Sequence, residues 1–237
     1  MLIKRRCLLI VFIVIILAMV FIVSGCKENE AETVQIPSEG LYTRCIKVKE
    51  KIPHDVIEAS LEYYDEDTLF KNSDLIFKGI VVDENTIGIE EYINGELERT
   101  YYRDSFTFEI EKIYYSEDPS LEVGDVIKVS NASCSYWWVE GTLKMEKGSE
   151  YIVITIKRSD LPDVEFSKCY DYYVENYWVP IIPIEDDKYY VDEELTSLTG
   201  NAEEEIIRKD GSFKTTVYVK GEEFEEELED LILEKKS

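Results

Sequence analysis

The chain has 237 residues, a formal net charge of −25 and a lone histidine. So much negative charge excludes nucleic acid and anionic lipid head groups as favoured partners, because both repel an acidic surface. The sequence also contains no phosphate-binding loop, dinucleotide fingerprint or H-E-x-x-H motif, so it lacks the signatures of common nucleotide enzymes and zinc proteases, and no cofactor is expected.

The first twenty-six residues predict export. Lys4–Arg6 is basic, Cys7–Val23 is an unbroken apolar run, and Val23–Cys26 reads V-S-G-C, which together are typical of a secretory signal. The last four residues resemble the lipoprotein box of bacterial lipoproteins, in which the cysteine thiol receives a diacylglycerol and the signal is cut just before it. The resemblance implies a signal peptide over residues 1–25 and a membrane anchor on Cys26, at the extracytoplasmic face of the bacterial cell membrane. An uncleaved anchor is the alternative, because the apolar run is just long enough to span a bilayer.

Residues 26–40 are polar and contain one proline and one glycine, so they predict a flexible tether. The N-terminal segment, residues 41–72, follows. Within it, Asp55–Phe70 predicts one short helix with Asp55 as its N-cap and three apolar residues at helical spacing.

The pattern changes to strands after residue 73. Leu75–Val82 is an apolar run typical of a buried strand, with a glycine that permits a bend. Ile87–Ile93 and Leu97–Tyr102 flank Asn94-Gly95, a strong hairpin signal.

Phe106–Ile110 alternates between apolar and polar residues and predicts a half-buried strand. The alternation slips at Lys112, which predicts a β-bulge there. Val126–Val129 and Tyr151–Ile156 predict further strands, each introduced by a glycine.

The C-terminal part, residues 159–237, is expected to pack on the preceding domain. Ile206–Arg208 and Phe213–Val219 flank Asp210-Gly211 and predict a second hairpin. Glu222–Lys235 predicts an amphipathic helix that docks on the sheet. Its apolar face comprises Phe224, Leu228, Leu231 and Ile232.

Ser73–Asp83, Phe106–Ser130 and Leu143–Ile154 resemble, in order, the OB-like barrel of the tissue-inhibitor-of-metalloproteinase and netrin-module group. The resemblance implies a mainly β fold: a small OB-like antiparallel β-barrel over residues 73–158, preceded by the signal helix and elaborated by the C-terminal hairpin and helix. The inhibitory chemistry of that group does not carry over, because it needs a free N-terminal cysteine locked by disulfides, whereas Cys26 is expected to be acylated and followed by a tether.

Cys45, Cys134 and Cys169 remain after export and acylation, so at most one disulfide forms among them. Cys134–Cys169 and Cys45–Cys134 both stay open as pairings. A zinc site built from these cysteines and His54 is disfavoured, because their spacings match no known zinc motif. His54 is expected to lie on the surface and to take no part in catalysis.

Aromatic residues provide the best candidate for a binding surface. Aromatic rings beside acids commonly contact sugars, and an OB-type face binds oligosaccharides. The alternative is that alternate rings are buried, because strands favour aromatic residues in any case. The candidates are Tyr136, Trp137, Trp138, Tyr172, Tyr173 and Trp178.

The sequence therefore predicts a lipid-anchored, non-catalytic binding module for an envelope protein or glycan. A cell-envelope hydrolase that uses paired carboxylates is the alternative, and it requires a cleft that contains an acid with a raised pKa, whereas a binding module requires an exposed aromatic patch without one. A structural envelope component stabilised by a divalent cation is a third hypothesis.

Overall fold

A computed structural model describes residues 36–48, 55–57, 65–131, 137–139, 143, 145–157, 170–174, 180–192, 194–195, 197–198, 204–207 and 215–237. The signal helix predicted within residues 1–25 and the acylation predicted at Cys26 concern residues outside this part of the chain. The described helices and strands all belong to one compact unit, Pro37–Ser237.

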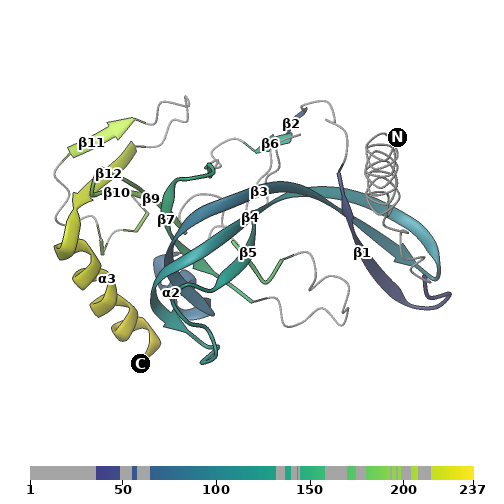
Figure 1. Ribbon diagram of the computed structural model, residues 1–237, viewed down its shortest axis with the longest axis horizontal. Coiled ribbons are helices and arrows are strands. Elements are labelled where there is room, and N and C mark those ends of the chain that lie inside the picture. The colour runs from purple at the N-terminus through teal and green to yellow at the C-terminus, as the bar shows by residue number, and fades with distance from the viewer. Residues whose placement is uncertain are drawn as a thin grey trace, which may run out of the picture. The chain divides into compact units, whose positions relative to one another are not determined.

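The fold is mainly β, as the sequence predicts (Figure 1). The strands are β1 (Leu41–Lys47), β2 (Asp55–Ile57), β3 (Leu75–Ile93), β4 (Glu96–Ser116), β5 (Val126–Asn131), β6 (Trp137–Val139), β7 (Glu150–Thr155), β8 (Tyr172–Tyr173), β9 (Ile181–Glu185), β10 (Lys188–Asp192), β11 (Glu204–Ile207) and β12 (Thr215–Lys220). The helices are α2 (Glu66–Asn72) and α3 (Gly221–Lys236).

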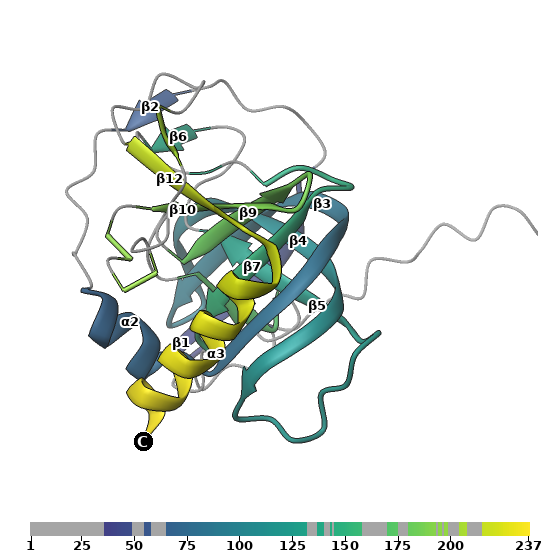
Figure 2. The ribbon, with the colours of Figure 1, turned by 90° about the vertical axis from the view of Figure 1, so that its left-hand side faces the viewer.

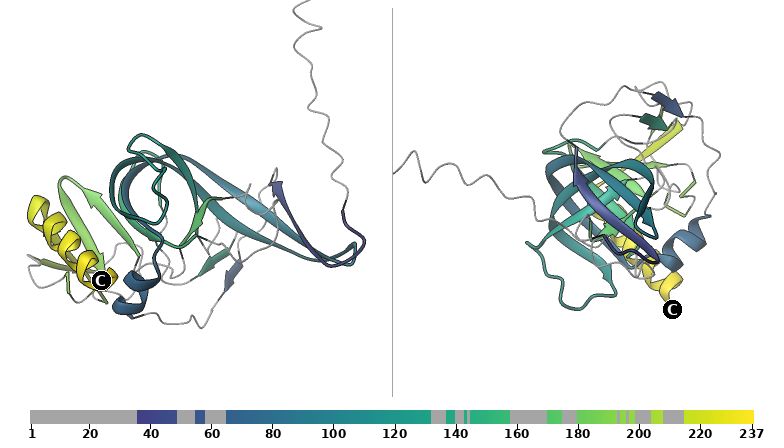
Figure 3. Two further views of the ribbon diagram at one scale, coloured as in Figure 1. Left: turned by 90° about the horizontal axis from the view of Figure 1, so that it is seen from below. Right: turned by 90° about the vertical axis from the view of Figure 1, so that its right-hand side faces the viewer.

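Most strands join one sheet in the order β11-β12-β10-β9-β7-β3-β4-β5-β8, with β1 paired to β3 as well, while β2 and β6 form a separate pair. This sheet does not close into a barrel. β3, β4 and β5 nevertheless curl strongly (Figure 3, left). An isolated bridge joins Ile156, just after β7, to Tyr173 of β8. Their backbones exchange two hydrogen bonds of 3.0 Å.

Bulges bend the long β3–β4 pair. The register shifts between Lys78 and Gly79, so that Glu111 of β4 has no Cα partner on β3. This confirms the bulge predicted next to Lys112. Gly79 also permits a close approach, because a Cβ added there would lie 2.6 Å from the carbonyl oxygen of Glu109. The predicted strands Leu75–Val82 and Ile87–Ile93 are therefore one continuous strand, since bulges bend it without ending it.

The Asn94-Gly95 hairpin is confirmed. Both residues have positive φ, 51° and 83°, as a tight two-residue turn requires. Beyond the reach of β5 and β7, β3 and β4 continue with β1 as their neighbour, and we call this three-stranded region the arm (Figure 1). The end of the predicted tether is fixed to the turn, because Gly40 N donates to Asn94 Oδ1 at 3.0 Å and Asn94 N donates to Gly40 O at 2.9 Å. The sequence did not predict β1.

Two apolar cores lie on opposite faces of β3 and β7, because successive residues of a strand point to opposite sides. Ile76 and Ile152 point into the first core, whereas Phe77 and Val153 point into the second. Helix α3 covers the first core together with α2 (Figure 2). The predicted docking of α3 is confirmed, with all four residues of its apolar face buried: Phe224, Leu228, Leu231 and Ile232.

The short N-terminal helix is not where the sequence predicted it. Asp55–Ile57 is the strand β2, and the helix α2 begins after Asp65, whose side chain accepts a hydrogen bond of 2.8 Å from the Thr68 amide. Asp65 is therefore the N-cap in place of Asp55. A short aspartate side chain followed by acids in the first turn is a typical helix start, and both candidates fitted it.

The C-terminal part extends the sheet. β9 pairs with β7, β10 with β9, and β12 with β10, all antiparallel. β11 pairs antiparallel with β12, as predicted for the second hairpin, whose turn at Asp210-Gly211 lies outside the described residues. The described strands of the C-terminal part therefore continue the sheet from β7.

Candidate functional site

Of the six aromatic residues predicted to form a platform, Tyr172 and Tyr173 lie side by side in β8 and point to opposite sides. Tyr172 is buried in the second core and so does not belong to an exposed platform. Tyr173 is partly exposed and packs against a third, small cluster beside the arm.

Strand pairing does not place the tryptophans beside Tyr172 and Tyr173. Trp137 and Trp138 belong to β6, opposite Asp55 and Val56 of β2, and only their backbone is described. Tyr136 and Trp178 lie outside the described residues.

One face of the arm carries a stack that the sequence analysis missed. Arg99, Tyr101 and Arg103 alternate along β4 and so share a face. The guanidinium carbons of the two arginines lie 5.5 Å and 5.7 Å from the centre of the Tyr101 ring, within cation–π range. Arg99 also pairs with Glu91 at 2.5 Å. The alternation R-x-Y-x-R in the sequence was the signal that could have revealed the stack.

The small cluster beneath this stack holds the aromatic rings in place. Ile87, Ile89 and Tyr170 are buried, and Tyr101 and Tyr173 pack against them as partly buried rings. We call Arg99, Tyr101, Arg103 and Tyr173 the arm face. It combines partly exposed rings, which stack on sugars or apolar groups, with guanidinium groups, which donate to carboxylates and phosphates.

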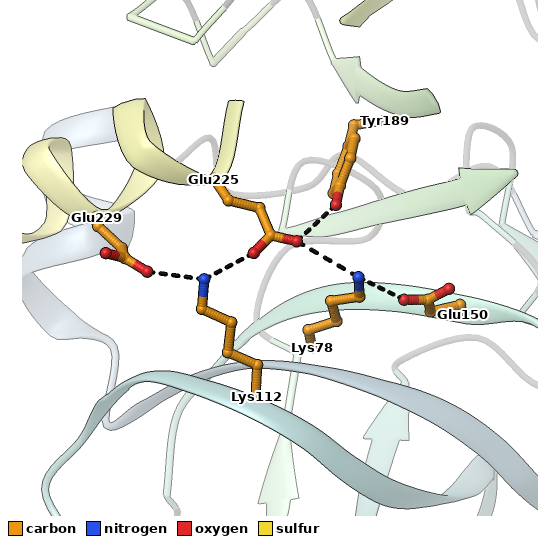
Figure 4. A network of polar contacts seen from close by, with 6 residues as sticks. All are labelled: Lys78, Lys112, Glu150, Tyr189, Glu225 and Glu229. Atoms are coloured by element: carbon orange, nitrogen blue, oxygen red, sulfur yellow. Dashed lines mark hydrogen bonds and ion pairs between the residues drawn. The ribbon is translucent and has the colours of Figure 1, made fainter. Parts of the chain in front are cut away.

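A second polar cluster joins α3 to the sheet (Figure 4). Its members are Lys78, Lys112, Glu150, Tyr189, Glu225 and Glu229. Glu225 is central: it accepts from Lys112 Nζ at 2.6 Å and from the Tyr189 hydroxyl at 2.6 Å. Lys78 Nζ lies 3.4 Å from Glu225 and 2.7 Å from Glu150. Lys112 also pairs with Glu229 at 2.8 Å.

The charges of this cluster stabilise its ionised form. Burial alone would raise the pKa of Glu225, but hydrogen bonds from Lys112 and Tyr189 and the charges of both lysines lower it to about 2. Burial opposes the charge on Lys78, yet its bonds to carboxylates hold its pKa above the usual lysine value. Glu225 therefore holds no proton to donate near neutral pH, and the cluster fastens α3 to the sheet.

One carboxylate nearby has the opposite tendency. Burial raises the pKa of Glu111, and the neighbouring carboxylates Glu150 and Glu109 raise it further, whereas Lys78 lowers it. Glu111 is the residue at the bulge of β4 and is exposed. Glu111 and Glu150 are therefore the described pair that best matches the carboxylates of the hydrolase hypothesis.

The other predicted features add no further candidate site among the described residues. No group of three or more His, Cys, Asp and Glu side chains within the described ranges could hold a metal ion. Cys45 is partly buried beside the small cluster, whereas His54, Cys134 and Cys169 lie outside the described part. Considering the described helices alone, neither is long and apolar enough to cross a membrane.

Comparison with known proteins adds no relative. A scan of protein-family models gave no match to this chain, and a search of curated proteins gave none either.

Proposed function

We propose that the protein is an exported lipoprotein, held at the outer face of the cell membrane through Cys26, that binds an envelope protein or glycan without catalysis. The basic, apolar and V-S-G-C segments of residues 4–26 support the anchor. The arm face carries the binding hypothesis, because two partly exposed tyrosines pack on one small cluster and two arginines stack on one of them.

An OB-like barrel is the architecture that we infer for β7, β3, β4, β5 and β8. These strands are consecutive in the sheet, and the Ile156–Tyr173 bridge links the two ends of the series. The second core lies on one face of all five strands, with Tyr151 and Tyr172 at its two ends. A five-stranded, partly open barrel is the form that OB-folds take.

Binding is tested by sedimentation of the protein with isolated envelope fractions. We expect Tyr101→Ala combined with Tyr173→Ala to weaken binding several-fold, because stacking rings supply much of the contact area at such sites. Tyr102→Ala is the matched control, since Tyr102 lies on the opposite face of β4 near Gly88. Equal binding by both variants and the parent would remove the arm face from the proposal.

Protease digestion of the envelope fraction distinguishes the two partners. Loss of binding after digestion identifies a protein, and retained binding identifies a glycan. The anchor is tested separately by intact-mass measurement of the membrane-extracted protein, which should carry a diacylglycerol on Cys26 and lack residues 1–25.

The hydrolase is a second candidate that rests on the raised pKa of Glu111 beside Glu150. In a glycosidase, an acid with a raised pKa protonates the leaving group while a second carboxylate assists. Release of soluble fragments from dye-labelled cell wall should then be abolished by Glu111→Gln. Equal release by the parent and the variant would exclude this pair.

A further inference from the structure

The outer end of the arm exposes several large apolar side chains. Three large apolar side chains there are about half exposed: Leu41 by 57%, Ile93 by 47% and Leu97 by 52%. They lie on the last residue pairs before the turn, because Leu41 is opposite Ile93 and Leu97 is opposite Tyr92. Clusters of exposed apolar side chains commonly mark contact surfaces.

These side chains point to both sides of the arm. Leu41 and Ile93 form a direct cross-strand pair and share one face. Leu97 is opposite Tyr92, the neighbour of Ile93, and therefore points to the other face. A protein partner docked on the sheet would cover one face of the arm. A fluid apolar medium, if the arm entered it end-on, would surround both faces.

Two polar groups of Asn94, in the turn, are already paired within the protein. The Asn94 amide and the Asn94 side-chain oxygen are both hydrogen-bonded to Gly40, at 2.9 Å and 3.0 Å. Polar groups paired within the protein cost less to remove from water than unpaired ones.

The tether arrives at the same end of the arm. Pro37 follows Cys26 by eleven positions, which corresponds to at most about 40 Å of extended chain. The flexible tether that the sequence predicts would span about 20 Å on average. An acyl group on Cys26 would therefore keep the end of the arm close to the bilayer.

We propose that the end of the arm, defined as Leu41, Ile93 and Leu97, inserts into the interfacial region of the lipid bilayer. The inference rests on the proposed lipid anchor and deepens it, since it adds a second, non-covalent contact. The anchor raises the effective concentration of bilayer at the arm, so a contact too weak to bind membranes alone suffices. The arm would then hold its own orientation to the membrane.

The acids around the apolar side chains set the kind of lipid. Glu39, Glu96 and Glu98 are exposed at this end of the arm, so anionic head groups would repel it. The contact should favour zwitterionic lipid.

The experiment replaces the acyl group by another attachment, so that it does not depend on native acylation. The chain from residue 27, with an N-terminal hexahistidine tag, is held on phosphatidylcholine vesicles by nickel-chelating lipid. Insertion is measured with Leu97→Trp, whose added tryptophan fluoresces and is quenched by brominated phosphatidylcholine. The quenching of the parent protein is subtracted, so that only the added tryptophan contributes. Leu233→Trp is the matched control, because Leu233 is 70% exposed on α3.

We expect the added tryptophan at position 97 to be quenched about threefold more than that at position 233. Phosphatidylglycerol in the vesicles should reduce this difference at low salt and not at high salt. Equal quenching at the two positions would overturn the proposal. A blue shift of Leu97→Trp emission that appears without vesicles, when the protein concentration is raised, would also overturn it. That result would show that the end of the arm contacts a second copy of the protein. Intact mass of the native protein tests acylation independently, so failure of the anchor and failure of the insertion are distinguishable.

Discussion

Removing the charge of Glu225 tests whether the polar cluster fastens α3 to the sheet. In Glu225→Gln the side chain keeps its size but loses its attraction to Lys78 and Lys112. The side chain of Glu225 is only 17% exposed, and that of Lys78 only 21%. The variant therefore leaves a largely buried ammonium group with Glu150 as its remaining partner.

The pKa of Glu225 bounds the expected loss. One pKa unit corresponds to about 1.4 kcal/mol, so a decrease from 4.5 to about 2 corresponds to at most about 3.5 kcal/mol. Lys112 is 38% exposed and Glu229 is 48% exposed, so water screens part of this attraction. We expect Glu225→Gln to lower the free energy of unfolding by about 1–2 kcal/mol at neutral pH.

The loss should depend on pH with a defined sign. Because the pKa of Glu225 is lowered in the fold, its contribution is complete above the unfolded-state pKa of about 4.5 and disappears as the pH falls towards about 2. Urea unfolding followed by circular dichroism gives the difference between parent and variant at each pH. That difference should shrink between about pH 5 and about pH 3.

Glu226→Gln is the control, because this substitution removes the same charge from the neighbouring position of α3, which is exposed. It should change stability by less than about 0.5 kcal/mol. Equal losses in the two variants, or a difference that does not vary with pH, would refute the role given to Glu225.

Three further substitutions test other parts of the fold by the same urea unfolding. Gly79→Ala should cost about 1–3 kcal/mol, because its Cβ would lie 2.6 Å from the Glu109 carbonyl oxygen and force the strands apart. Lys236→Met should cost about 1–2 kcal/mol, because the ammonium group donates to the Ser73 carbonyl at the end of α2. Gly95→Ala should cost about 1 kcal/mol, because φ at this turn residue is 83°.

Controls accompany each of these variants. Glu84→Ala, at an exposed position of β3, should be nearly neutral where Gly79→Ala is not. Lys236→Arg keeps a donor and should recover part of the loss. Gly95→Asn should be milder than Gly95→Ala, because asparagine tolerates positive φ. Neutral behaviour of Gly79→Ala, Lys236→Met or Gly95→Ala would contradict the contact assigned to that residue.

The parts of the fold that the sequence predicts well are those with strong local signals. The Asn94-Gly95 turn needs positive φ, and the apolar face of α3 repeats at helical spacing, so each could be predicted without its surroundings. The bulge near Lys112 was visible because a single extra residue breaks strand alternation.

Tertiary contacts decide the rest. Both Asp55 and Asp65 precede segments that could begin a helix, and the segment after Asp65 buries Leu69 and Phe70 in the first core. β1 lacks a regular alternation of polar and apolar residues over its seven positions, and it is held as a strand by pairing with β3 far along the chain. The platform prediction took in Tyr172 because aromatic composition does not reveal which face of a strand a ring occupies. The stack around Tyr101 could have been predicted only by considering strand alternation together with the charges of the two arginines.

Residues in the last turn of α3 contact both ends of α2. Lys235 pairs with Asp67 in the first turn of α2, and Lys236 donates to the Lys71 and Ser73 carbonyls at its other end. These contacts join residues far apart in the sequence, so α2 is held fully in place only when α3 is docked. Local unfolding of α3 would therefore also loosen α2 and open the first core to water.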